Sequence, residues 1–77
     1  MSSIDSMTQD FVQAWLPYIE TEADGTLHYA YFLGLKDFEI VSGATRLQAI
    51  ANVTNRLRSW TAARLRLHQH LTWPTYT

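Results

Sequence analysis

Apolar residues follow two different periods along this chain. Between residues 16 and 42 they form short runs separated by Asp-Gly or by single glycines, which is typical of strands joined by tight turns. From about residue 46 they recur every three or four positions, which is the spacing of one helix face. This apolar stripe comprises Ile50, Val53, Leu57 and Trp60. The pattern therefore predicts several strands followed by one long helix.

Three strands are predicted, at residues 16–22, 27–33 and 38–42. Asp24 and Gly25 indicate a hairpin between the first two, because glycine tolerates the positive φ that tight turns need. Alternation along the second strand gives two faces. One holds Leu27, Tyr29 and Tyr31, and the other holds His28, Ala30 and Phe32. Both faces carry apolar groups, so we expect both to be covered.

The helix is predicted over about residues 46–67. Thr45 and Gln48 match a capping box, in which the hydroxyl accepts a free backbone N–H and the amide reaches back to the cap. Residues 1–12 are expected to be frayed or to form a short helical turn. Residues 68–74 are expected to form a last strand or an extended tail. These elements predict an α+β fold with two layers, in which one long helix packs on one face of a three- to four-stranded antiparallel sheet.

Composition adds that the 77 residues form a single domain, 1–77. The 3 Trp, 4 Tyr and 3 Phe are many for so small a core, which favours a partner interface and a homodimer. The sequence contains no cysteine, so a disulfide and a thiolate metal site are excluded. It shows no signal-peptide pattern and no apolar run of membrane-spanning length, so the cytoplasm is the expected compartment.

The formal net charge of −1 conceals a marked asymmetry. All seven acidic residues lie within residues 1–39, together with one lysine, whereas residues 40–77 carry five arginines and no acid. Either the two halves neutralise one another within the fold or a dimer, or the basic half binds an anionic partner.

Several turns and caps between residues 18 and 53 occur together in a known family. An aromatic strand leads to the Asp24-Gly25 hairpin, a second aromatic strand ends at Phe32, and a tight turn covers residues 33–38. Residues 43–45 and 46–49 then supply a cap and a helix opening. Over roughly residues 16–74 the chain resembles the HicB antitoxin family. The resemblance implies a partial RNase-H-like fold, here as a stand-alone core without a DNA-binding domain. It also implies neutralisation of a protein partner, a small basic toxin, by steric capture.

Reactive chemistry receives little support from the sequence. Asp37 and Glu39 flank one apolar residue, and such pairs are more typical of a solvated face than of an acid–base pair. His68 and His70 have the two-residue spacing that would let both bind one metal ion from a strand, but no third ligand is evident unless strand pairing brings His28 close. We therefore predict no catalytic, cofactor-binding or metal-binding residue and no enzyme activity.

Three hypotheses for function follow. The first is a non-enzymatic protein-interaction module resembling a HicB-type antitoxin. The second is a small nucleic-acid-binding protein, whose helix would bind phosphates while nearby aromatic rings stack on bases. Those residues are Arg56, Arg58, Arg64 and Arg66, with Trp60, Trp73 and Tyr76. The third is a phage-type inhibitor or accessory protein that blocks a host complex. The residues predicted to bind a partner are Tyr29, Tyr31, Arg56, Arg64, Trp73 and Tyr76.

Overall fold

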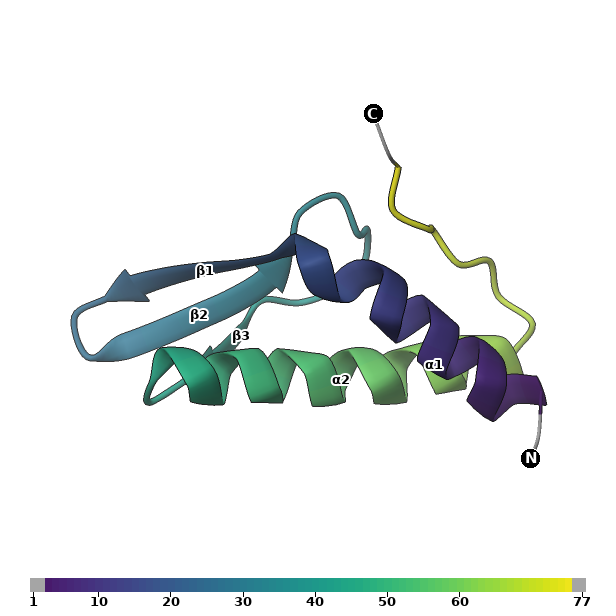
Figure 1. Ribbon diagram of the computed structural model, residues 1–77, viewed down its shortest axis with the longest axis horizontal. Coiled ribbons are helices and arrows are strands. Elements are labelled where there is room, and N and C mark those ends of the chain that lie inside the picture. The colour runs from purple at the N-terminus through teal and green to yellow at the C-terminus, as the bar shows by residue number, and fades with distance from the viewer. Residues whose placement is uncertain (1–2, 76–77) are drawn as a thin grey trace.

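The computed structural model of the chain describes residues 3–75. Its elements are α1 (Ser3–Trp15), the 3₁₀-helix η1 (Leu16–Tyr18), β1 (Ile19–Asp24), β2 (Leu27–Phe32), β3 (Val41–Gly43) and α2 (Arg46–Arg66) (Figure 1). The strands form one antiparallel sheet in the order β1-β2-β3, and the long helix α2 packs against it. The predicted α+β class is therefore confirmed, and the sheet has three strands.

The hairpin of β1 and β2 is set by its two-residue loop. Ile19 pairs with Phe32 at one end and Asp24 pairs with Leu27 at the other, leaving Gly25 and Thr26 to make the turn. Gly25 has φ 65, a conformation that costs a glycine little. The first strand begins at Ile19 rather than at residue 16, because Pro17 lies within a 3₁₀ turn.

The long helix begins as predicted at its cap. The Thr45 hydroxyl accepts a hydrogen bond from the Gln48 N–H at 3.0 Å. The Gln48 side chain reaches back one residue beyond the cap, where its oxygen accepts from the Ala44 N–H at 2.9 Å. Val53 and Leu57 of the predicted stripe are fully buried, and its other two members are half-buried. The stripe is therefore the face that α2 turns to the core.

A second helix, α1, occupies the region for which fraying or a short helical turn was expected. Its buried residues, Thr8, Phe11, Val12 and Trp15, are spaced as one face of a helix. This face packs on α2, which is longer than the sheet and extends beyond it (Figure 1). Fraying is therefore the wrong alternative for residues 3–12, because contact with α2 stabilises a helix that its polar sequence would not support alone.

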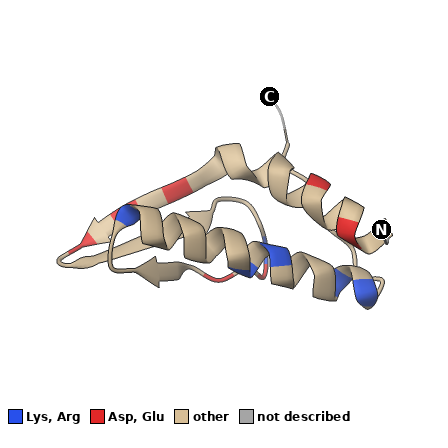
Figure 2. Cartoon of the chain, turned by 60° about the horizontal axis from the view of Figure 1, so that its bottom comes forward, with Lys and Arg blue, Asp and Glu red and all other residues tan. Residues whose placement is uncertain are grey.

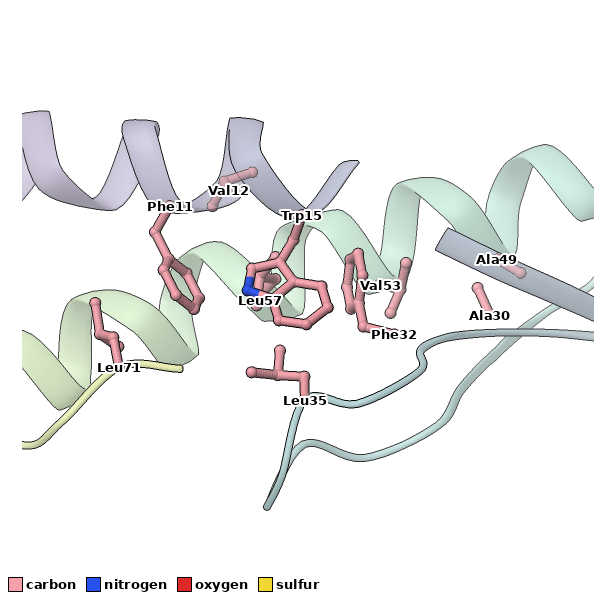
Figure 3. Packing of buried hydrophobic residues seen from close by; sticks show 10 residues of the cluster. All are labelled: Phe11, Val12, Trp15, Ala30, Phe32, Leu35, Ala49, Val53, Leu57 and Leu71. Carbon is pink, nitrogen blue, oxygen red and sulfur yellow. The ribbon is translucent and has the colours of Figure 1, made fainter. Parts of the chain in front are cut away.

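Contacts between aromatic rings join α1 to the sheet (Figure 3). Trp15 of α1 meets Phe32 of β2 edge to face, with ring centroids 6.0 Å apart. The Trp15 indole N–H also donates to the Thr72 carbonyl at 3.0 Å, which fixes the C-terminal segment against α1. The buried core comprises Phe11, Val12, Trp15, Ala30, Phe32, Leu35, Ala49, Val53, Leu57 and Leu71. Most of the aromatic content is thus used inside one molecule.

Two further predicted strands differ from the structure. Phe38 leaves the sheet because its ring packs edge to face on Phe32 and Trp60, at 5.6 and 5.5 Å, so β3 begins only at Val41. Residues 69–75 form no strand, and the extended alternative holds for them. Among the described residues, no helix is both long and apolar enough to cross a membrane.

Gly43 generates a prediction about stability. A Cβ at this position would lie 2.5 Å from the Ala49 backbone N and 2.9 Å from its Cα, so β3 and α2 approach too closely for any side chain. We expect Gly43→Ala to reduce the free energy of unfolding by at least about 2 kcal/mol, because backbone atoms would have to move.

Urea denaturation followed by tryptophan fluorescence measures this change. The neighbouring exposed residue provides the control, since Ser42→Ala should change stability by less than about 0.5 kcal/mol. Equal midpoints for the two variants would contradict the close approach of β3 and α2.

Candidate protein-binding surface

Among the described residues, α2 covers one side of the sheet and no helix lies on the other. Ala30 and Phe32 are buried toward α2, so their strand neighbours Tyr29 and Tyr31 point to the opposite side. We call this opposite side the outer face. By strand register it comprises Glu20, Glu22, Asp24, Leu27, Tyr29, Tyr31 and Ser42. Ile40, in the loop before β3, lies beside them. Within the described residues only one face of the second strand is covered, and the cover expected for its other face, by a second molecule, stays a prediction.

Acidic and tyrosine side chains meet across β1 and β2 on this face. Glu22 is paired with Tyr29, and Glu20 is paired with Tyr31. The Tyr31 hydroxyl donates diagonally to Glu22 Oε1 at 3.2 Å. Beside these residues lies an open hollow of about 480 Å³, and Ile40, which is 64% exposed, contributes to its lining. The face thus combines large rings, an apolar side chain and negative charge.

The charges of the outer face are uncompensated within residues 3–75. Glu20, Glu22 and Asp24 form no ion pair there. Partial burial, the hydrogen bond to Glu22 and the charges of Glu22 and Glu20 together raise the pKa of Tyr31 above its ordinary value of 10.0. At neutral pH the Tyr31 hydroxyl is therefore protonated and donates a hydrogen bond to the Glu22 carboxylate. The face as a whole is suited to cationic and hydrogen-bond-donating groups.

The predicted partner-binding residues do not form one site. Tyr29 and Tyr31 lie together on the outer face, whereas Arg56 and Arg64 belong to α2, in the other layer (Figure 2). Trp73 packs edge to face on Phe11, with centroids 4.9 Å apart, and is about half exposed. Tyr76 lies outside the described residues.

The two arginines already have intramolecular contacts. Arg56 pairs with Glu39 at 3.7 Å, and both side chains are largely exposed. Arg64 donates to the His70 carbonyl from Nε at 3.2 Å and from Nη2 at 2.8 Å. Its guanidinium also lies 4.8 Å from the centre of the Trp60 ring. The Arg56–Glu39 pair joins the basic and acidic halves, in line with the neutralisation alternative, whereas Arg64 is engaged within the basic half.

The proposed base-stacking rings are also engaged. Trp60 packs between Phe38 and Phe11, with ring centroids 5.5 and 6.4 Å away, and is half-buried. Trp73, another ring proposed to stack on bases, lies in the C-terminal segment and contacts Phe11. These rings therefore stabilise the junction of α1, α2 and the tail.

The acidic residues and histidines considered above for acid–base catalysis or metal binding do not form one site. Asp37 has φ 64 in a turn rather than a strand conformation, and Glu39 follows it in a loop. His28 lies in β2, whereas His68 and His70 follow the end of α2. Within residues 3–75, no group of three or more acidic or histidine side chains is placed to hold a metal ion.

The acidic residues of the outer face were missed in the sequence, although a signal for them exists. Glu20, Glu22 and Asp24 are spaced by two, so on a strand they share one face. Extending the hairpin register back from Gly25 would have placed them beside the two tyrosines. Ile40 had no comparable signal, because its exposure depends on how the loop before β3 is held.

No family model, curated protein or solved structure matches the chain. The resemblance to the HicB family stays a prediction, and the functional argument depends on the geometry of the outer face.

Tyr31 provides a direct test of that geometry. Replacing Glu22 by Gln removes one negative charge beside the phenol, so the pKa of Tyr31 should fall toward its ordinary value. Carbon-13 NMR of labelled tyrosine rings, followed from pH 8 to pH 12 and assigned with Tyr31→Phe, measures the shift. Glu39→Gln removes the same charge from the loop that pairs with Arg56 and should leave Tyr31 unchanged. Equal effects of the two variants would contradict the arrangement.

Proposed function

We propose that this chain is a non-enzymatic protein-interaction module, which binds a partner protein through the outer face and neutralises it by steric capture. This is the mode of action that its resemblance to HicB-type antitoxins implies. One observation supports it most strongly: Tyr29, Tyr31 and Ile40 lie beside three carboxylates that form no ion pair within residues 3–75, on a sheet face that no described helix covers.

Tyrosines suit such a role for a physical reason. A tyrosine ring buries a large apolar area on binding, and its hydroxyl keeps a hydrogen bond available at the rim. Tyrosine is accordingly frequent among residues that dominate binding energy at protein interfaces. Here the Tyr31 hydroxyl is oriented by Glu22, so its position is already fixed before a partner arrives. Such preorganisation reduces the entropy lost on association.

The charge of the outer face favours a basic protein over a nucleic acid. Phosphates would be repelled by Glu20, Glu22 and Asp24, whereas lysine and arginine side chains would be attracted. The arginines of α2 remain the basis of the nucleic-acid alternative, but Arg56 and Arg64 are already engaged with Glu39 and His70. The proposal places the module in the cytoplasm and includes the expected homodimer, in which each copy would keep its outer face free.

The test is co-expression of the tagged chain with the product of the adjacent reading frame, followed by co-purification. The Tyr29→Ala/Tyr31→Ala double variant should bind this product at least about tenfold more weakly, because aromatic anchors often contribute ~2 kcal/mol or more. The activity of the partner should return as binding is lost. Titration calorimetry and a partner-activity assay measure the two effects.

The control is Leu67→Ala, which truncates an exposed apolar side chain at the far end of α2. It should leave affinity unchanged, and urea denaturation should show that all variants are folded. Turnover of a substrate by the purified chain would refute the proposal. So would RNA binding whose affinity falls steeply with salt and depends on the α2 arginines.

A further inference from the structure

The two edge strands of the sheet, β1 and β3, differ in length and in the contacts along their free sides. β3 has only three residues, and Asn52 Nδ2 of α2 donates to the Ser42 carbonyl at 3.0 Å. A neighbouring strand at that edge would have to displace this bond. β1 has six residues and no neighbour on its other side among the described elements. Figure 1 shows β1 as the outermost strand, with neither helix lying along its free side.

The free side of β1 presents unpaired backbone groups. In an antiparallel pair, every second residue turns its N–H and C=O away from the partner strand. Along the six residues of β1 this leaves a row of donors and acceptors about 20 Å long. Such a row is the template used when an extended peptide adds a strand to a sheet.

Self-association at this edge is disfavoured by charge. Antiparallel pairing always places residues of the same face opposite one another. Every β1 residue on the outer face is acidic, so a second copy would set Glu20, Glu22 and Asp24 against the same three residues. Like charges directly opposite each other are destabilising. The free edge of β1 therefore disfavours pairing with β1 of a second copy, whereas it can pair with a strand that is not acidic.

The same register specifies the complementary strand. Residues of an added strand that lie on the outer face would have Cβ atoms about 5 Å from those of Glu20 and Glu22, within reach of an ion pair for Arg or Lys. On the inner face, Arg46 Nε donates to Thr21 Oγ1 at 3.3 Å, so a cation there would meet an arginine. An added strand therefore fits β1 when cationic residues on its outer face alternate with small uncharged residues on its inner face.

We propose that the free edge of β1 binds an extended segment of the partner protein that carries Arg or Lys at alternate positions. The segment adds a fourth strand, its cations lying beside Glu20, Glu22 and Tyr31. This inference rests on the proposed protein-binding function and names the chemistry and conformation of the bound segment. Steric capture then follows, because a segment held in the sheet is unavailable for its own activity.

The probe is a fluorescein-labelled octapeptide with arginine and threonine in alternation. Two isomers carry backbone N-methyl groups on alternate residues, one on the arginines and the other on the threonines. One set of N–H groups faces β1 and the other faces solvent, so one isomer loses the strand bonds while charge is constant. Fluorescence anisotropy should show affinities that differ by at least about tenfold. Equal affinities would mean electrostatic attraction alone and would overturn the proposal.

A charge-matched pair of variants tests the position of the site. Glu20→Gln/Glu22→Gln should weaken binding of the unmodified octapeptide about tenfold, because both cross-strand ion pairs are lost. Asp10→Asn/Asp37→Asn removes the same charge from α1 and a turn and should leave affinity nearly unchanged. Hydrogen exchange should show peptide-dependent protection of alternate amides in β1. Equal weakening by both double variants, or protection elsewhere, would overturn the proposal.

Two further outcomes separate this inference from the proposed function. If the partner binds and depends on Tyr29 and Tyr31 while the N-methyl isomers bind equally, the module stands and the edge proposal fails. If the isomers differ but no partner protein is captured, the edge site stands and steric capture fails. If a second copy occupies the edge, the octapeptide will compete with dimerisation seen by light scattering, and the proposal is overturned.

Discussion

The contact between Trp15 and Phe32 is the interaction on which the rest of the structure depends. α2 is longer than the sheet, so part of its apolar stripe would be exposed if the strands were its only partner. α1 covers that part, and the 6.0 Å edge-to-face contact joins α1 to β2 above the stripe. The Trp15 N–H bond to Thr72 brings the C-terminal segment to the same point. Within residues 3–75, neither helix lies on the other side of the sheet, so the outer face is open there.

This one-sided cover also separates the charges. The acidic residues of β1 lie on the outer face, while the arginines lie on α2 in the other layer (Figure 2). The pairing of Arg56 with Glu39 neutralises part of the asymmetry at the loop before β3, but it joins exposed side chains and contributes little to stability. The electrostatic potential over the outer face is therefore negative. A negative potential raises the rate of association with cationic partners and disfavours binding of anionic ones.

Features set by neighbouring residues were predictable from the sequence, and features set by distant contacts were not. The hairpin at Gly25 and the cap at Thr45 depend on residues within a few positions of one another, and both are confirmed. The full length of α1 was missed because residues 1–10 are mostly polar or small, so that the helical conformation there depends on contact with α2. Phe38 was assigned to a strand, but its ring packs on Phe32 and Trp60, and the residue lies outside the sheet. The engagement of Arg64 likewise depends on where the tail places the His70 carbonyl.

The two sheet edges limit how copies of this chain can associate. Asn52 occupies an acceptor at β3, and three acids repel a second β1, so neither edge favours a continuous sheet between copies. A contact between the acidic outer face of one copy and the basic helix of another would be attractive but heterologous. Because those surfaces lie in opposite layers, repetition of that contact would build a ring or an open chain of molecules rather than a closed dimer. A closed homodimer would have to use exposed apolar residues of the helical side, such as Leu47 of α2, which leaves the edge of β1 accessible in both copies.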